Sequence, residues 1–205
     1  MCHPLRSRRM RPPQASTSQT LKVFRRIGRP LDLLRAARTS AVESSQPAAG
    51  STSPVSRAGQ TAPGFALPNQ HGELIESRAL GEQAYFLVFY PFAFSAVCGS
   101  ELEELEKVRE EFAAQSTRIM GVSVDHKYAL RTYADQAHFG FDLLADFWPH
   151  GAVAKSYGAF NTESGAATRH TFLIQQGRVV DSFSSPIHQA RAIARYREAM
   201  DLLTS

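Results

Sequence analysis

The hydrophobic positions of residues 58–205 follow two different periods, which predict strands alternating with helices. Residues 85–90 are apolar throughout, as expected for a central strand that is covered on both faces. The stretch after Cys98 instead repeats its apolar residues every three or four positions, which indicates a helix with one buried face. The apolar stripe of this helix consists of Leu102, Leu105, Val108 and Phe112.

The rest of this region continues the pattern and ends in a hairpin and a helix. A turn at 69–72 joins two short strands, the second over 74–77. The later elements are predicted as strands over 118–124 and 141–145, helices over 127–137 and 152–157, a hairpin of 171–174 with 179–183, and a closing helix over 189–203. This order predicts a three-layer α/β/α sandwich of the thioredoxin-like kind. A functional site is expected at the carboxyl ends of its strands.

Residues 1–57 break the pattern and differ sharply in charge. They hold 11 lysines and arginines against two acidic residues, a net charge of +9, whereas residues 58–205 hold 12 basic and 17 acidic residues, a net charge of −5. The sequence therefore predicts a basic, mostly disordered N-terminal extension and linker over 1–57 and one folded domain over 58–205. The acidic balance of that domain argues against nucleic-acid binding by it. No apolar run approaches the ~18–20 residues that span a bilayer, so we expect no integral membrane segment.

Three interpretations of the N-terminal extension stay open. It contains a basic amphipathic stretch that Pro30 should break or kink, followed by a Ser/Ala/Pro/Gly-rich linker over 44–56. It is a plain disordered extension, a mitochondrial or plastid transit peptide, or a segment that binds an anionic membrane or nucleic acid. We expect a cytoplasmic protein, or an organellar one if residues 1–57 are a transit peptide. The apolar residues of the amphipathic stretch are Leu21, Phe24, Ile27, Leu31 and Leu34.

Cys98 is the candidate reactive residue because it follows a strand and lies in the first turn of a helix. The unpaired N–H groups and partial positive charge of a helix N-terminus favour the thiolate, which is the nucleophilic form of cysteine. A lone cysteine is more often an inert, small, buried side chain, and only the placement of Cys98 argues otherwise. The two cysteines, Cys2 and Cys98, are too few for a disulfide framework. We therefore expect a thiol-based enzyme in which Cys98 attacks an electrophile.

The residues around Cys98 resemble a known family. The octet 91–98, Pro-Phe-Ala-Phe-Ser-Ala-Val-Cys, resembles the peroxiredoxin signature Pro-x-x-x-Thr/Ser-x-x-Cys, and Glu101 and Leu102 extend the match. The segments 144–158 and 168–172 look like the one-cysteine branch of alkyl hydroperoxide reductase E. The resemblance covers 58–205 and leaves the N-terminal extension outside it.

The resemblance assigns a role to each residue of the candidate site. Cys98 would be the peroxidatic nucleophile and would form a sulfenic acid. Pro91 would shape the loop and shield the site from water, and Arg169 would stabilise the thiolate and the charge on the leaving oxygen. Ser95 would hydrogen-bond the peroxide, although it stands where threonine is commoner and lacks the β-branch that restricts χ1. Glu101 is expected in a supporting, hydrogen-bonding role.

The catalytic cycle would need an external thiol. Glu103 occupies the position where one subclass carries its resolving cysteine, residues 189–205 contain no cysteine, and Cys2 lies beyond a long linker. The resemblance implies a low-molecular-weight thiol such as mycothiol or glutathione, with a mycoredoxin, glutaredoxin or thioredoxin-type partner. It also implies a homodimer. The histidines form no H-x-x-x-H or Cys/His cluster, so neither a metal nor a bound cofactor is expected.

Hydrogen peroxide and organic hydroperoxides are the predicted substrates, and the apolar Phe92 and Phe94 near Cys98 favour the organic ones. A dithiol oxidoreductase is disfavoured because Glu101 occupies the second cysteine position of a C-x-x-C motif. A monothiol enzyme that exchanges disulfides or glutathionyl groups on the same fold is the main alternative. A non-enzymatic binding protein that docks through its basic extension is a further one.

Overall fold

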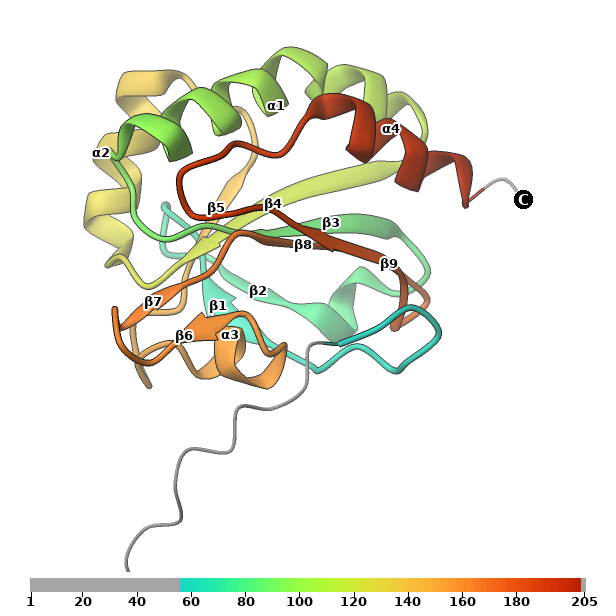
Figure 1. Ribbon diagram of the computed structural model, residues 1–205, viewed down its shortest axis with the longest axis horizontal. Helices are drawn as coiled ribbons and strands as arrows, with labels where there is room; N and C mark the ends of the chain where they lie inside the picture. Colours follow the sequence, from blue (N-terminus) through green and yellow to red (C-terminus); the bar gives the residue numbers. More distant parts are fainter. Residues whose placement is uncertain (1–55, 204–205) are drawn as a thin grey trace, which may run out of the picture. The chain divides into compact units, whose positions relative to one another are not determined.

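The computed structural model describes residues 56–203, which form a mixed five-stranded sheet with helices on both faces (Figure 1). The strand order is β5-β4-β3-β8-β9. The strands β3, β4 and β5 run parallel, and β8 lies antiparallel between β3 and β9. The bounds are β3 Ala84–Phe89, β4 Thr117–Ser123, β5 Asp142–Ala145, β8 His170–Gln175 and β9 Arg178–Ser184.

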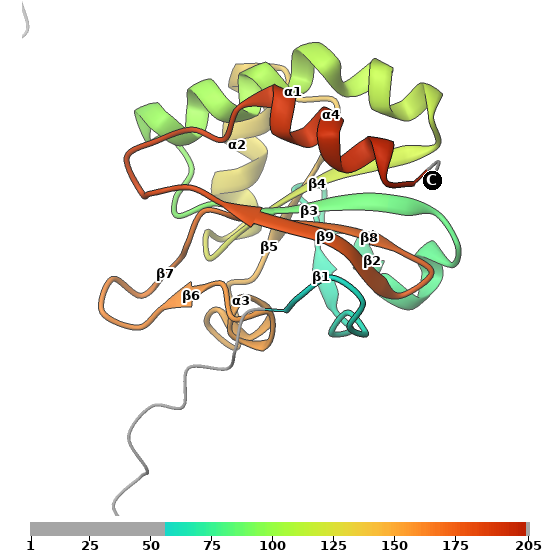
Figure 2. The ribbon, with the colours of Figure 1, turned by 45° about the vertical axis from the view of Figure 1, so that its right-hand side comes forward.

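The helices form two layers of unequal size (Figures 1 and 2). The crossovers β3–α1–β4 and β4–α2–β5 step in the same direction, so their right-handedness places both helices on one face. The C-terminal helix α4 joins them there, and α3 lies on the other face. The bounds are α1 Ala96–Ala114, α2 Lys127–Ala137, α3 Ala152–Ser156 and α4 Ile193–Asp201.

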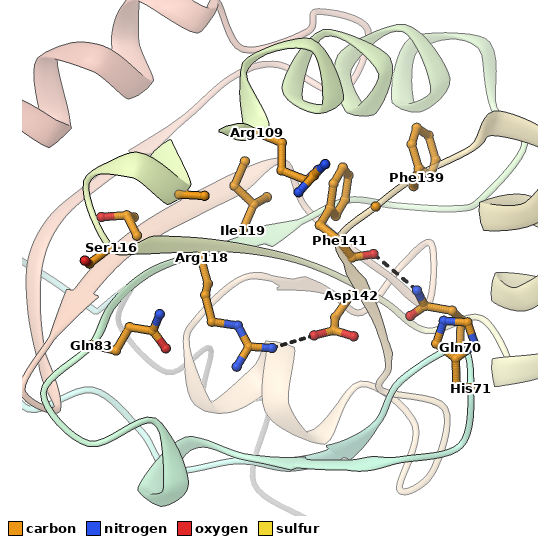
Figure 3. A pocket seen from close by; sticks show the side chains of 13 residues that line it. Gln70, His71, Gln83, Arg109, Ser116, Arg118, Ile119, Phe139, Phe141 and Asp142 are labelled. Carbon is orange, nitrogen blue, oxygen red and sulfur yellow. Dashed lines mark hydrogen bonds and ion pairs between the residues drawn. The ribbon is translucent and has the colours of Figure 1, made fainter. Parts of the chain in front are cut away.

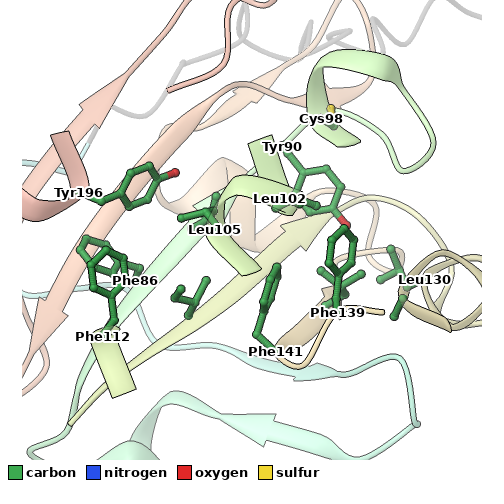
Figure 4. Packing of buried hydrophobic residues seen from close by; sticks show 14 of the residues in the cluster. Phe86, Tyr90, Cys98, Leu102, Leu105, Phe112, Leu130, Phe139, Phe141 and Tyr196 are labelled. Atoms are coloured by element: carbon green, nitrogen blue, oxygen red, sulfur yellow. The ribbon is translucent and has the colours of Figure 1, made fainter. Parts of the chain in front are cut away.

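Alternate residues of β3 separate two hydrophobic cores. Phe86 and Val88 point into the core under α1, α2 and α4, whereas Leu87 and Phe89 belong to the core on the α3 side. Figure 4 shows the first core, in which Phe86 and Phe112 lie with their ring centroids 5.5 Å apart. The strand is buried along its whole length, as its apolar sequence predicted.

Shorter elements close the ends of the sheet. The hairpin of β1 (Ala66–Pro68) and β2 (Leu74–Glu76) precedes the 3-10 helix η1 (Ser77–Leu80), and Asn69 bridges to β5 at one sheet edge. A second hairpin joins β6 (Phe160–Asn161) and β7 (Ala166–Ala167). At the other sheet edge, residues 59–61 run beside the start of β9: Gly59 N donates to Val179 O at 2.8 Å, and Val179 N donates to Gln60 O at 2.9 Å.

The structure confirms the thioredoxin-like sandwich and corrects two details. The predicted closing helix over 189–203 was wrong at its start, because α4 begins at Ile193 after an extended Ala192. The residues before it leave the helix path, and among them the Arg191 side chain turns into the buried interior. The β6–β7 hairpin was not predicted, because strands of two residues leave no hydrophobic period to read.

The predictions for the N-terminal extension lie outside the described residues, apart from its last two positions. These are the amphipathic stretch, most of the linker, Cys2 and the targeting alternatives. Ser56, the first described residue, is buried, and its N–H donates to Tyr157 O at 3.2 Å. Within 56–203, no helix is long and apolar enough to cross a membrane.

Candidate active site

Cys98 lies where a buried strand gives way to a helix. β3 ends at Phe89, a loop follows, and Ser95 is the N-cap of α1. The first helical hydrogen bond closes from Gly99 N to Ser95 O at 2.8 Å, which places Cys98 inside the first turn. The Cys98 side chain is 0% exposed and packs at the end of the core beneath α1 (Figure 4). The sulfur is therefore shielded from water and lies close to the positive end of the helix.

Arg169, immediately before β8, holds its guanidinium against this sulfur. Nη2 donates to Cys98 Sγ at 3.1 Å, Nη1 donates to Glu101 Oε2 at 2.7 Å, and Nε donates to Ile187 O at 2.7 Å. The side chain is 2% exposed, so three partners hold the planar cation in one orientation. A cation in this place stabilises a thiolate and any negative charge that develops beside it.

Glu101 links Arg169 to a second buried arginine. It lies one helical turn after Cys98, and its other oxygen, Oε1, accepts from Arg191 Nε and from the Tyr196 hydroxyl at 3.2 Å. With Cys98 as thiolate, the cluster holds two negative and two positive charges and is balanced. With a neutral thiol it carries an uncompensated positive charge, which is costly in a buried place. The cluster thus joins two buried cations and one carboxylate to the Cys98 side chain.

Arg191 is buried with part of its hydrogen-bonding capacity unused. Among the described residues, its Nη1 and Nη2 have no partner, and its side chain is 1% exposed. Burial opposes its charged form, but interactions with Tyr196 and Glu101 outweigh burial and raise the Arg191 pKa. Tyr196 is held in turn by the Thr171 hydroxyl at 3.1 Å, and burial raises its own pKa. Arg191 therefore remains a cation.

The loop between β3 and α1 is tied down at its centre and strained at its end. Ala93 N donates to Asp125 Oδ2 at 2.8 Å, which anchors the loop beyond the end of β4. Phe94 adopts φ of 62°, a left-handed conformation that costs energy in a residue with a side chain. The ring of Phe94 lies 4.9 Å from that of Tyr133 on α2. The Ser95 hydroxyl makes no hydrogen bond within 56–203, so it is available to a ligand.

A cavity of about 730 Å³ opens beside this loop. Pro91, Ser95 and Arg169 lie on its wall together with apolar side chains such as Phe92 and Ile187. A substrate would approach the guanidinium of Arg169 through this cavity.

A second cavity, of about 370 Å³, lies at the opposite end of the sheet, near the start of β4 (Figure 3). Its wall is polar, and Arg118 Nη2 donates to Asp142 Oδ2 there at 2.7 Å. The Gln70 side chain donates to Phe141 O at 3.2 Å on the same wall. Because β3 and β4 are parallel and Cys98 follows the far end of β3, this cavity is remote from the thiol.

The structure brings some of the predicted site residues into contact and others only near. Cys98, Arg169 and Glu101 form one hydrogen-bonded cluster. Pro91 and Ser95 lie on the loop and line the cavity, and neither makes a hydrogen bond to Cys98 within the described chain. Within 56–203, no three His, Cys, Asp or Glu side chains gather in a way that could hold a metal ion.

Sequence reasoning missed residues that join the cluster from the C-terminal segment. Arg191 and Tyr196 stand 90 and 95 positions after Glu101. Arg191 lies just before a helix whose start was placed too early, and no local pattern separates it from a surface arginine. His170, on the wall of the larger cavity, belongs to the segment 168–172 that carried the resemblance, but no role was predicted for it.

Comparison with known proteins identifies the family of the chain. Residues 58–182 match the model of the AhpC/TSA family. The chain is 38% identical over 123 residues to alkyl hydroperoxide reductase E of Mycobacterium tuberculosis, an alignment that covers 60% of this chain and 80% of the relative. The match to the protein of that name from Mycobacterium bovis has the same extent.

Solved structures give the same result. The crystal structure of peroxidoxin BcpB from Mycobacterium tuberculosis superposes with a TM-score of 0.63 and 26% identity, over 73% of this chain and 97% of the other. The structure of Enterococcus faecalis AhpC, at 21% identity and a TM-score of 0.66, covers 73% of this chain and 95% of the other and supports the fold. The chain thus belongs to the AhpC/TSA family, the peroxiredoxins, and is a thiol-dependent hydroperoxide reductase.

Proposed function

We propose that this peroxiredoxin is a one-cysteine enzyme that reduces hydrogen peroxide and organic hydroperoxides at Cys98. The observation that carries the proposal is the 3.1 Å contact between Arg169 Nη2 and the buried Cys98 Sγ, beside an open cavity. A cation held this close favours the nucleophilic thiolate. In the proposed reaction it would also stabilise the negative charge that the second peroxide oxygen gains.

The chemistry balances with the groups present. The Cys98 thiolate attacks one oxygen of the hydroperoxide, so that an S–O bond forms and the O–O bond breaks. The sulfur is oxidised to a sulfenic acid, and the other oxygen leaves as an alkoxide or hydroxide that takes up a proton. Arg169 donates to the leaving oxygen as charge develops, and the free hydroxyl of Ser95 orients the peroxide. Pro91 shapes the loop and shields the reacting sulfur from water.

An external thiol closes the proposed cycle. Cys98 is the only cysteine within 56–203, and Glu103 stands where a nearby resolving cysteine would lie. A first thiol displaces water from the sulfenic acid and forms a mixed disulfide, which a second thiol reduces back to Cys98. A low-molecular-weight thiol such as mycothiol or glutathione, working with a mycoredoxin, glutaredoxin or thioredoxin-type protein, is the proposed reductant. No bound cofactor takes part.

We further propose a homodimer, supported by exposed aromatic side chains near the active-site end of the sheet. Tyr128 and Trp148 are 71% and 81% exposed, and the His126 ring lies 4.9 Å from Tyr128 and 4.8 Å from Phe147. Large exposed apolar groups of this kind commonly mark protein interfaces. Sedimentation analysis of the wild type and of Trp148→Ser tests this, and a monomeric wild type would refute it.

The proposed compartment is the cytoplasm, with an organelle as the alternative if residues 1–57 direct import. A fluorescent protein fused behind residues 1–57 distinguishes the two by its location in cells.

Rapid mixing of the reduced full-length chain with one equivalent of hydroperoxide tests the peroxidase proposal. Oxidation of Cys98 at about 10⁴ M⁻¹s⁻¹ or faster, with a sulfenic acid trapped by dimedone, is expected on an enzymatic scale. Cys98→Ser is the control and should give neither signal. Reaction no faster than that of a free thiol, together with deglutathionylation of a peptide in the absence of peroxide, would instead establish the monothiol exchange enzyme.

A further inference from the structure

The cavity beside the active-site loop is much larger than hydrogen peroxide requires. Its volume is about 730 Å³, whereas a water molecule occupies roughly 30 Å³ in the liquid. Most of its surface is apolar, and the side chains that make it so include Phe92, Val97, Ala166, Ala167 and Ile187. Such a space suits a hydroperoxide with a hydrocarbon body, and it raises the question of which polar group on the wall would recognise the rest of the molecule.

His170 is a ring held rigidly in this wall. Its Nδ1 lies 2.9 Å from the Thr168 hydroxyl oxygen, and its ring stacks on Phe172 with an interplanar angle of 18° and 6.0 Å between centroids. These two contacts limit rotation about the side-chain bonds. The position of the remaining nitrogen, Nε2, is therefore set before any substrate arrives.

The Nε2 atom of His170 is available to a ligand. Within 56–203 it has no hydrogen-bond partner, yet it is not among the fully buried polar atoms that lack one, which are Tyr90 Oη, Tyr133 Oη and the terminal nitrogens of Arg191. Nε2 is thus not fully enclosed, and the His170 side chain is one of those that line the cavity. Burial, with a smaller contribution from the charge of Arg191, lowers the His170 pKa, so the ring is neutral near pH 7.

The neutral ring would present a hydrogen-bond donor to the cavity. When the Thr168 hydroxyl donates to Nδ1, the ring proton resides on Nε2. An N–H donor in an apolar wall gains most from a charged acceptor, because such hydrogen bonds are about twice as strong as neutral ones.

We propose that His170 is a specificity-determining residue, and that the cavity accepts organic hydroperoxides that carry a carboxylate in addition to the hydroperoxide group. The inference rests on the proposed peroxidase function and deepens it. The hydrocarbon body lies against Phe92 and Ile187, the carboxylate accepts from His170 Nε2, and the hydroperoxide reaches the Arg169 end of the cavity. Hydrogen peroxide is too small to use His170, so its reaction does not depend on this residue.

Three probes and two variants test the proposal in the full chain. The probes are hydrogen peroxide, a medium-chain hydroperoxy acid below its micelle concentration, and the methyl ester of that acid. The rate constant for Cys98 oxidation is measured for each. His170→Phe keeps a ring that stacks on Phe172 but removes the donor. His170→Gln offers an amide nitrogen near the position of Nε2 and serves as the matched rescue.

The expected result is selective. His170→Phe should lose about tenfold or more on the acid, the effect of one hydrogen bond to a charged group, and change less than about twofold on the ester and on hydrogen peroxide. His170→Gln should recover most of the rate on the acid. Equal rates of wild type on acid and ester, or an equal loss by His170→Phe on all three probes, would overturn the proposal. Failure of the wild type to react with hydrogen peroxide would instead refute the proposed peroxidase function.

Discussion

Arginine and carboxylate pairs lie at both ends of the sheet, and their surroundings give them different uses. At the Cys98 end, the Arg169 and Glu101 side chains are 2% and 1% exposed and share a cluster with the Cys98 sulfur. At the opposite end, the Arg118 and Asp142 side chains are 37% and 19% exposed and line a polar cavity without a nucleophile. Water screens the second pair, so it contributes little, whereas the first pair acts at nearly full strength on whatever charge lies beside it.

In this chain, burial and not residue type distinguishes the arginine of the proposed active site from the arginine at the other end of the sheet. The same burial creates a cost, because Arg191 keeps two terminal nitrogens without partners among the described residues. Four predictions test the contrast, from the large losses expected at the buried cluster to the small effect expected at the pair on the opposite end of the sheet.

Arg169→Met should slow the oxidation of Cys98 by hydrogen peroxide by about 100- to 1,000-fold, which corresponds to about 2.7–4 kcal/mol for one lost donor to a developing oxyanion. The substitution keeps an unbranched side chain of similar length but removes the charge. Stopped-flow oxidation of the reduced protein measures the effect, with circular dichroism as the check on folding. A rate within threefold of wild type in a folded variant would show that Arg169 does not act on the reacting atoms.

Arg191→Met should destabilise the domain by about 3–5 kcal/mol, because the buried Glu101 carboxylate loses one of its two arginine partners. Urea unfolding followed by circular dichroism gives the change. The double variant Glu101→Gln/Arg191→Met removes both charges and should recover part of the loss. If the double variant is less stable than the sum of the single variants predicts, the charge-balance argument fails.

The pH dependence of stability should carry a contribution from His170. Burial lowers its pKa in the folded chain, so below the unfolded value of about 6.5 the unfolded chain takes up a proton that the folded chain resists. Stability is therefore lost as the pH falls through this range. When the pH is lowered from about 7.5 to 5.5, the urea midpoint should fall less in His170→Phe than in the wild type. Parallel curves for the two proteins would contradict the assignment.

Arg118→Met should have the smallest effect. An ion pair that water reaches contributes about 1 kcal/mol, so the unfolding free energy of this partly exposed pair's variant should drop by about that much and Cys98 oxidation should not change. It is the matched control for Arg169→Met, since each substitution removes one arginine from a carboxylate. A marked loss of peroxidase rate in Arg118→Met would show that the two ends of the sheet are coupled.

Much of the fold was predictable because it depends on local periodicity. The apolar run at 85–90 became the central strand, and the helix predicted over 127–137 was found with those bounds. The start of the last helix was not predictable in the same way: Ala192 is extended, and Arg191 before it contacts a glutamate 90 residues earlier in the chain. Hydrophobic period carries no information on such long-range ion pairs.

The candidate site shows the same division. Cys98 was identifiable from its strand–loop–helix setting, and Arg169 only through resemblance to a family. His170 lies next to Arg169 in the segment 168–172 that carries the resemblance, but no role was predicted for it. Its availability depends on the Thr168 hydroxyl and the Phe172 ring, and those contacts become visible only when β8 is placed in the sheet.

The outer side of β9 has a consequence for association between copies of the chain. Residues 59–61 already occupy the hydrogen-bonding groups at its start, and further along Ser182 N donates to the side chain of Asp181, which is paired with Arg195. An uncovered sheet edge is a template on which another strand can add and from which aggregates grow. On β9, residues 59–61 cover one end of this edge, and the ion pair between Asp181 and Arg195 lies near its middle. Addition of another strand along β9 is therefore disfavoured, and we expect a second copy to bind through side chains on another surface.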